Sequence, residues 1–160
     1  MPDGSLFERD FYAWTREQAA ALRRMLAARA NTELDLEHLA EAVEEMGNSD
    51  LGALQSDLAR VIEHLLKLEY SPAADPRREW VLSVIEHRGR AQFAIERSGT
   101  LKRMLPDIAP GAWRHGRTLA AKAMQMLDAV DPRSLPAECP YGIDQILDED
   151  FFPANRHGSE

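Results

Sequence analysis

Cysteine is almost absent from this sequence: the 160 residues contain one, Cys139. One cysteine cannot form an internal disulfide, and without a second cysteine it cannot build a thiolate metal site. No base stands near it in the sequence to activate a thiol for catalysis. We therefore interpret Cys139 as a small, buried group, which is how free cysteines usually occur.

Long apolar runs are also missing. No segment approaches the roughly 20 apolar residues that a membrane helix needs. The first residues, MPDGSLFERD, lack the basic and then apolar pattern of a signal peptide. The sequence therefore predicts a cytoplasmic protein without a membrane segment.

Familiar catalytic motifs are not found either. The sequence has no GxSxG, P-loop or GxGxxG pattern. Ser49, Ser56 and Ser83 fall where helix caps and helix surfaces explain them, so none is indicated as a nucleophile. These absences favour a noncatalytic protein over an enzyme, and we expect no cofactor.

A positive net charge is lacking as well, since the formal charge is -8. This balance makes nucleic acid an unlikely partner. The charge is uneven, because residues 1–70 hold 7 Lys/Arg against 14 Asp/Glu, residues 71–127 hold 10 against 5, and residues 128–160 hold 2 against 8. We expect the acidic C-terminal segment to lie over the basic middle of the chain.

Helical periodicity is what the sequence does contain. Apolar residues recur at spacings of three and four, and strand-like alternation is absent. The capping-box pattern Ser5–Glu8 predicts the start of a first helix, Gly47 predicts the end of a second, and Ser49 predicts the cap of a third. The five predicted helices occupy about residues 5–30, 32–47, 49–70, 77–99 and 111–131.

The third predicted helix has the clearest apolar stripe, and we expect it to form the centre of the core. Apolar residues that we expect to face inward on the third helix are Leu51, Leu54, Leu58, Val61, Leu65 and Leu68. Those expected to face inward on the first, fourth and fifth helices include Phe7, Met25, Val84, Ile85, Ala91, Trp113 and Leu127.

Short connections between these helices favour antiparallel neighbours. The length suits one domain, and the 44% of hydrophobic residues suffice for a core. The sequence therefore predicts an all-α protein, an up-and-down antiparallel bundle of four to five helices with an irregular C-terminal strap. We expect a single domain over residues 1–160, with the bundle at about 6–130, the strap at about 131–153 and a tail at 154–160.

The C-terminal stretch ECPYGIDQILDEDFFP permits two interpretations. Its apolar residues could anchor it to the bundle as a strap, with about one turn of helix within residues 144–148. Alternatively, it could be an acidic, aromatic docking peptide for another protein. The strap is favoured because a single turn of helix needs support from a packed neighbour.

Histidine and glutamate side chains are candidates for a metal site, because helical bundles can hold metals between facing helices. The weak candidates are His38, Glu41, His64 and His87. The Glu-x-x-His pattern of di-iron bundles does not occur, and a turn at residues 47–50 would set His38 opposite about residue 59, roughly 7 Å from His64. No metal is therefore expected, and His64 and His87 are interpreted as hydrogen-bonded core histidines.

Four blocks of the sequence carry a family resemblance: ERDFYAW, LDLEHLAEAVEEMGNSD, HLLKLEY and ECPYGIDQILDEDFFP. In this order they resemble a bacterial family known only as domain of unknown function number twenty-nine. The resemblance spans nearly the whole chain. It departs after the HLLK block, where the family has a tryptophan and this chain has Leu68, and the fifth-helix region matches only loosely. It implies an all-helical domain and brings no activity, cofactor or catalytic residue with it.

Two functions from different classes remain open. The first is a noncatalytic helical protein-interaction module, favoured by the missing catalytic motifs and the aromatic-rich ends of the chain. Its partner could be another protein or a further copy of the chain. The second is a metal- or small-molecule-binding helical bundle that uses the His and Glu side chains named above.

Overall fold

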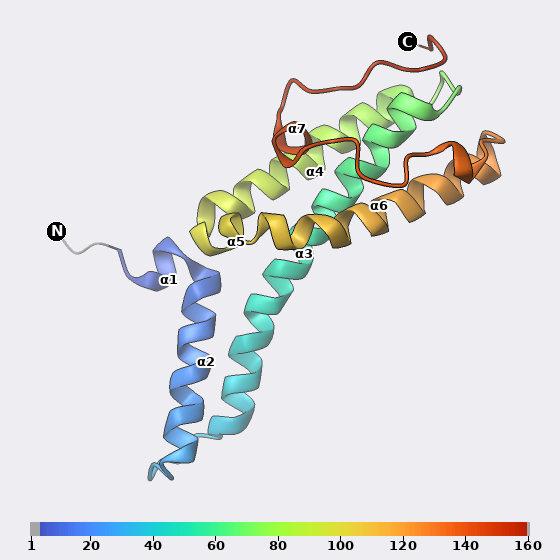
Figure 1. The fold of residues 1–160 in the computed structure, drawn as a ribbon. Helices are drawn as coiled ribbons and strands as arrows, with labels where there is room; N and C mark the ends of the chain where they lie inside the picture. The colour runs from blue at the N-terminus through green and yellow to red at the C-terminus, as the bar shows by residue number, and fades with distance from the viewer. Residues whose placement is uncertain (1–3, 160) are drawn as a thin grey trace. The chain divides into compact units, whose positions relative to one another are not determined.

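The computed structural model describes residues 4–159 and is built from helices and loops, with no strand in that range (Figure 1). This confirms the predicted all-α class with its irregular C-terminal segment. The helices are α1 (Leu6–Arg9), α2 (Phe11–Ala27), α3 (Leu36–Tyr70), α4 (Arg77–Arg97), α5 (Gly99–Arg103), α6 (Leu105–Leu127), the 3-10 turn η1 (Pro132–Ser134) and α7 (Ile143–Leu147).

The chain forms two compact units, which we call unit 1 and unit 2. Unit 1 consists of Met1–Ala53 and Phe93–Met104, and unit 2 of Leu54–Gln92 and Leu105–Glu160. Both α3 and α4 contribute residues to each unit. The organisation as one domain over residues 1–160 stays a prediction. No helix within residues 4–159 combines the length and hydropathy needed to span a bilayer.

In unit 1, α2 packs antiparallel to the first half of α3 (Figure 1). The sequence predicted that a helix ends at Gly47, and this is wrong, because α3 continues through Gly47 to Tyr70. A Cβ atom at Gly47 would overlap Oγ1 of Thr15, a buried residue of α2. The glycine therefore permits close contact between two helices. This packing outweighs the cost of a glycine within a helix, which is about 1 kcal/mol relative to alanine.

One edge of this hairpin is closed by charged side chains. Glu44 of α3 accepts hydrogen bonds from both Arg16 and Arg23 of α2, and the Arg16–Glu44 distance is 2.9 Å. Arg16 also donates to Oδ1 of Asn48, one turn further along α3, at 3.1 Å. These contacts fix the register of the two helices along the hairpin.

Asp10 joins the start of α2 to the α5 region of unit 1. Its Oδ1 accepts from the Ala13 amide at 3.1 Å and from Ser98 Oγ at 2.6 Å. Its Oδ2 accepts from the amide and the hydroxyl of Thr100, at 2.9 and 2.7 Å. Asp10 is thus the N-cap of α2, whereas Ser5 makes no side-chain cap bond to α1. Burial opposes the charge of Asp10, but the bonds from Ser98 and Thr100 prevail and lower the pKa of its carboxyl.

We predict that Asp10→Ala lowers the free energy of unfolding by about 1–3 kcal/mol at neutral pH, because a cap and several bonds to a charged group are lost. Since the folded pKa lies below the ordinary value of 3.8, this contribution is present above pH 3.8 and is lost as the pH falls through the folded pKa. Urea denaturation of the wild type and the variant should therefore differ at pH 7 and converge in strong acid. The exposed control Glu33→Ala should change little, and equal effects of the two substitutions would contradict the prediction.

In unit 2, residues from Leu54 onward in α3 pack against α4 and α6. The predicted stripe is confirmed here, since Leu54, Leu58, Val61, Leu65 and Leu68 are all buried. Against this face, a Cβ at Gly116 of α6 would lie 2.6 Å from the Ala59 carbonyl oxygen, so glycine again permits close helix contact. Two inward assignments were wrong, because Ile85 is 54% and Leu127 is 81% exposed.

We predict that Leu58→Ala and Leu65→Ala each lower the free energy of unfolding by about 2–5 kcal/mol, because each removes a fully buried side chain and leaves a cavity. Leu82→Ala is the matched control, since Leu82 is about half exposed on α4. Chemical denaturation at neutral pH measures all three. Core substitutions no more damaging than the control would show that the stripe does not form the core.

The C-terminal segment packs on unit 2 as a strap, with α7 as its single helical turn. The Tyr141 hydroxyl donates to Glu69 at 2.6 Å, and Ile146 of α7 is buried. Contacts continue past residue 153, because the Asn155 amide donates to the carbonyls of Leu68 and Ser71, at 2.8 Å each. The segment therefore closes over the last turns of α3.

Candidate functional site

The structure places His38 and Glu41 in unit 1 and His64 and His87 in unit 2. His38 is exposed at the start of α3, where its Nδ1 lies 2.7 Å from Oδ2 of Asp35. This hydrogen bond raises the pKa of His38. Glu41 lies one turn further along the same helix and is exposed. The contacts of His38 are therefore those of a helix start.

His64 and His87 each have a local partner. Nδ1 of His64 lies 2.8 Å from the carbonyl oxygen of Arg60, so this nitrogen donates, and burial lowers the pKa of the ring. Nδ1 of His87 lies 2.8 Å from Oδ1 of Asp57 across the α3–α4 contact. Both histidines are thus hydrogen-bonded, but both are half-buried and do not lie in the core. Across residues 4–159, no group of three His, Cys, Asp or Glu side chains is arranged to hold a metal ion.

Sequence reasoning missed a buried arginine next to His87. Arg88 of α4 is 1% exposed, and its guanidinium donates to backbone carbonyls of the strap. Nε donates to the carbonyl of Ile146 at 2.8 Å, and Nη2 to those of Gln145 at 3.3 Å and Phe151 at 3.1 Å. The signal was present, because Arg88 follows Val84 by four residues and precedes Ala91 by three, on the buried face of α4.

These bonds complete the C-terminal end of α7. The last carbonyls of a helix have no partner within it, and a nearby cation is favourable there. Gln92, one turn beyond Arg88, donates to the next carbonyl, that of Leu147, at 2.7 Å. The Phe152 ring lies beside the guanidinium, with 5.3 Å from the ring centroid to Cζ. Two polar side chains of α4 therefore hold the end of α7.

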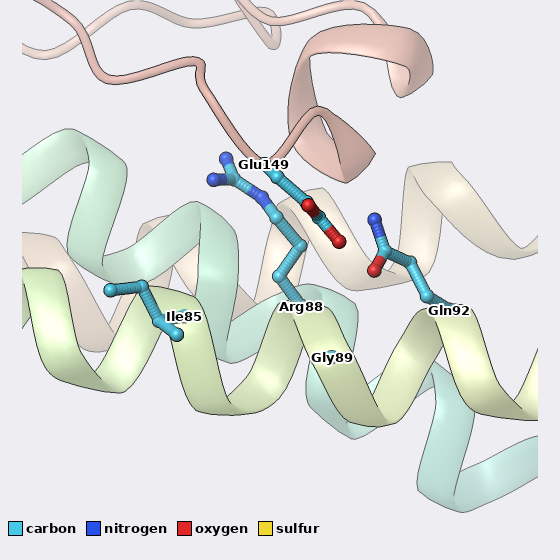
Figure 2. Close-up of a pocket in the computed structure, with 5 residues that line it drawn as sticks. All are labelled: Ile85, Arg88, Gly89, Gln92 and Glu149. Carbon is cyan, nitrogen blue, oxygen red and sulfur yellow. The ribbon is translucent and has the colours of Figure 1, made fainter.

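A pocket of about 320 Å³ adjoins this arginine, lined by Ile85, Arg88, Gly89, Gln92 and Glu149. Figure 2 shows the guanidinium reaching toward the strap, while the Glu149 side chain lies between Arg88 and Gln92. Burial lowers the pKa of Arg88, and the charges of Asp148 and Glu149 oppose that change. Nη1 of Arg88 is buried without a hydrogen-bond partner among residues 4–159. The polar groups that do make contacts here serve to hold the strap.

We predict that Arg88→Met lowers the free energy of unfolding by at least about 2 kcal/mol. One buried and two partly buried carbonyls lose their donor, and a buried acceptor left unpaired costs about 1–3 kcal/mol. The strap should also become susceptible to proteolysis between residues 138 and 153. The control is Arg90→Met, which removes an exposed ion pair with Glu86 and should cost about 0–1 kcal/mol. Denaturation and mass analysis of protease fragments check both effects, and an unchanged digestion pattern would show that the carbonyl contacts do not hold the strap.

A second cavity of about 450 Å³ lies between α6 and the strap in unit 2. Trp113, Tyr141 and Ile146 contribute apolar surface, and Trp113 Nε1 donates to the carbonyl of Ala137 at 3.4 Å. Cys139 also lines the cavity, and burial raises the pKa of its thiol. The thiol donates to the carbonyl of Tyr141 at 3.3 Å and is half-buried, so it is less enclosed than the buried position expected for Cys139.

Exposed apolar side chains gather on the α2–α3 hairpin of unit 1. Opposite the edge that carries Arg16, Arg23 and Glu44, each helix has an apolar stripe that its neighbour does not cover. The stripe of α2 consists of Phe11, Trp14, Ala21 and Met25, interrupted by the polar Gln18, and that of α3 consists of Leu39, Ala42 and Met46, followed by the polar Ser49. We call these two stripes together the hairpin face.

The two stripes belong to one surface. Phe11 of α2 and Ala42, Met46 and Ser49 of α3 line the same groove. Phe7 of α1 extends it, because its ring packs edge-on against those of Phe11 and Trp14, with centroids 5.4 and 4.9 Å apart. Phe7, Met25, Leu39 and Met46 are nevertheless 38–50% exposed. The inward position predicted for Phe7 and Met25 was therefore wrong, since they lie on this open face.

Comparisons with known proteins support the fold. A family model described as "Domain of unknown function DUF29" matches residues 6–152. A crystal structure of an alpha-helical protein of unknown function from Rhodospirillum rubrum is similar, with a TM-score of 0.74 and 28% sequence identity over 91% of this chain and 90% of that chain. No curated protein matches the sequence. The likeness covers nearly the whole chain and names no activity.

Proposed function

The chain belongs to the DUF29 family, and from this premise we propose that it is a noncatalytic helical protein-interaction module. Its docking surface is the hairpin face, and its partner is a protein that presents apolar helical surface with the same spacing. The proposal includes a bacterial, cytoplasmic setting, which the unpaired cysteine and the Rhodospirillum relative support.

The observation that carries this proposal is the spacing of the exposed apolar residues. On α3, the apolar residues Leu39, Ala42 and Met46 follow one another at intervals of three and four, which is the spacing of a seam between packed helices, and the small polar Ser49 continues the row three residues later. The side of α3 that faces α2 is formed by other residues, namely Leu36, Ala40 and Gly47. The helix thus has one apolar stripe for its neighbour and a second stripe without a neighbour.

An uncovered second stripe is costly in a protein that acts alone. Contiguous exposed apolar surface is uncommon on monomeric proteins and usually marks a site of interaction. A helix seldom exposes apolar residues at seam spacing, because that side is normally polar. The rim of the groove is polar, with Glu45 and Asp50 beside Met46, as the rims of protein interfaces are.

The test is site-specific photo-crosslinking in the native host. A photoreactive residue in place of Met46 should give a discrete crosslinked species, because this position faces the partner. The same residue in place of Glu41, exposed on the opposite side of α3, should give none. Crosslinks to this chain itself or to another protein would both support a docking face. No product from position 46, or equal products from both positions, would contradict the proposal.

A further inference from the structure

We propose that the partner of the hairpin face is a second copy of this chain, so that two α2–α3 hairpins pack face to face as a two-fold symmetric four-helix bundle. This inference rests on the proposed function. Closed two-fold dimers are the commonest assemblies of soluble proteins, and each surface patch in them meets its own copy. The hairpin face must then be complementary to itself. The register of α2 against α3 determines which residues a two-fold axis would bring together.

The register follows from contacts within the hairpin. Gly47 lies directly beside Thr15. Arg16 bonds to Glu44 and Asn48, which are one turn apart, so it is level with about residue 46. Because the helices are antiparallel, each step forward on α2 is level with one step backward on α3. A position about midway between Ala19 and Ala20 is therefore level with one midway between Ala42 and Val43.

Two large residues of each stripe are arranged symmetrically about that level. On α3, Leu39 and Met46 are equally far from it on either side. On α2, Trp14 and Met25 are also equally far from it. A two-fold axis perpendicular to the helices at this level would place Leu39 against Met46 of the other copy and Trp14 against Met25 of the other copy. The same axis therefore pairs large residues on both helices. Two stripes that did not share an interface would have no reason to be centred on the same level.

The small residues suit the same arrangement. Ala21 of α2 and Ala42 of α3 lie in the middle of their stripes, within about two residues of the axis. Antiparallel helices that cross a two-fold axis approach closely when the residues there are small, while larger residues interdigitate on either side. On α3 the small Ala42 lies between the larger Leu39 and Met46, and on α2 the axis would place Ala21 against Gln18 of the other copy.

Charge at the outer edge of α2 is self-complementary as well. Glu17 and Arg24 are both exposed, and neither side chain makes a hydrogen bond or ion pair with the rest of residues 4–159. They lie on either side of the axis, at distances that agree within about two residues. The axis therefore brings Arg24 of each copy near Glu17 of the other. A copy docked in the opposite direction would place Glu17 beside Glu45 instead.

Unit 1 has a thin core that a second copy would complete. Its buried apolar residues are Tyr12, Ala19, Leu36, Ala40 and Leu101. So small a set supplies little apolar burial, and small helical units commonly gain stability by association. Four helices around a shared core are a stable arrangement, whereas a lone hairpin leaves one side open.

Sedimentation equilibrium of the full chain tests the inference, over about a hundredfold range of concentration so that mass action is visible. The wild type should move from the mass of one chain to that of two. Met46→Glu should raise the dimer dissociation constant at least tenfold, because it places a charge from each copy in the shared core. Arg78→Glu, an exposed charge reversal in unit 2, is the control and should leave the constant unchanged.

A charge swap tests the orientation of the two copies. Arg24→Glu and Glu17→Arg should each weaken the dimer several-fold, and the double variant should restore it. All these positions are exposed, so circular dichroism should show the same helix content for each variant. A chain that is monomeric throughout overturns the inference, as does a dimer that ignores Met46→Glu or the swap. If it is monomeric but position 46 crosslinks to another protein, the second copy is wrong and the docking function stands.

Discussion

The packing of the strap against α4 depends on the hydrogen bonds that the buried guanidinium of Arg88 donates. A charge removed from water is costly unless hydrogen bonds replace its contacts with water. Here Nε and Nη2 donate to backbone carbonyls from the end of α7 and from Phe151, whereas Nη1 has no partner among residues 4–159. The dependence is mutual, because α7 has five residues and is too short to be stable without support. The strap supplies acceptors for the arginine, and the arginine in turn holds the strap in place. The expected attraction between acidic strap and basic helices is therefore expressed mainly through carbonyl oxygens.

Much of the fold could be predicted from the sequence, since apolar spacing determined the helix class and the stripe of α3 from Leu54 to Leu68. The failures have a common cause, which is that tertiary packing outweighed a local rule. Gly47 is a typical helix end, yet in the structure it gives Thr15 room against an unbroken helix. Ile85 was expected to face inward and is exposed, whereas Arg88 is buried. Hydrophobicity alone could not show that the carbonyls of the strap would hold the arginine inside.

The candidate sites divide in the same way. Spacing drew attention to four histidine and glutamate residues, but it could not reveal that Asp35, Arg60 and Asp57 are the groups that engage the three imidazoles. Part of the hairpin face was visible in the sequence, since Phe7 and Met25 belong to a periodic apolar row, and both were expected to face the interior of the bundle. Periodicity identifies an apolar side of a helix. Whether that side meets the same chain or another molecule depends on where the other helices lie.

The distance along the chain between Arg88 and its acceptors has a consequence for biosynthesis. Those acceptors lie 57, 58 and 63 positions further toward the C-terminus. Translation proceeds at about 5–20 residues per second, so the arginine leaves the ribosome seconds before its partners exist. During that interval the guanidinium stays hydrated, and unit 2 cannot close around it. Closure of this unit therefore has to wait until residues 145–151 have left the ribosome, and a nascent chain stalled before residue 145 would present an open, charged α4 to chaperones.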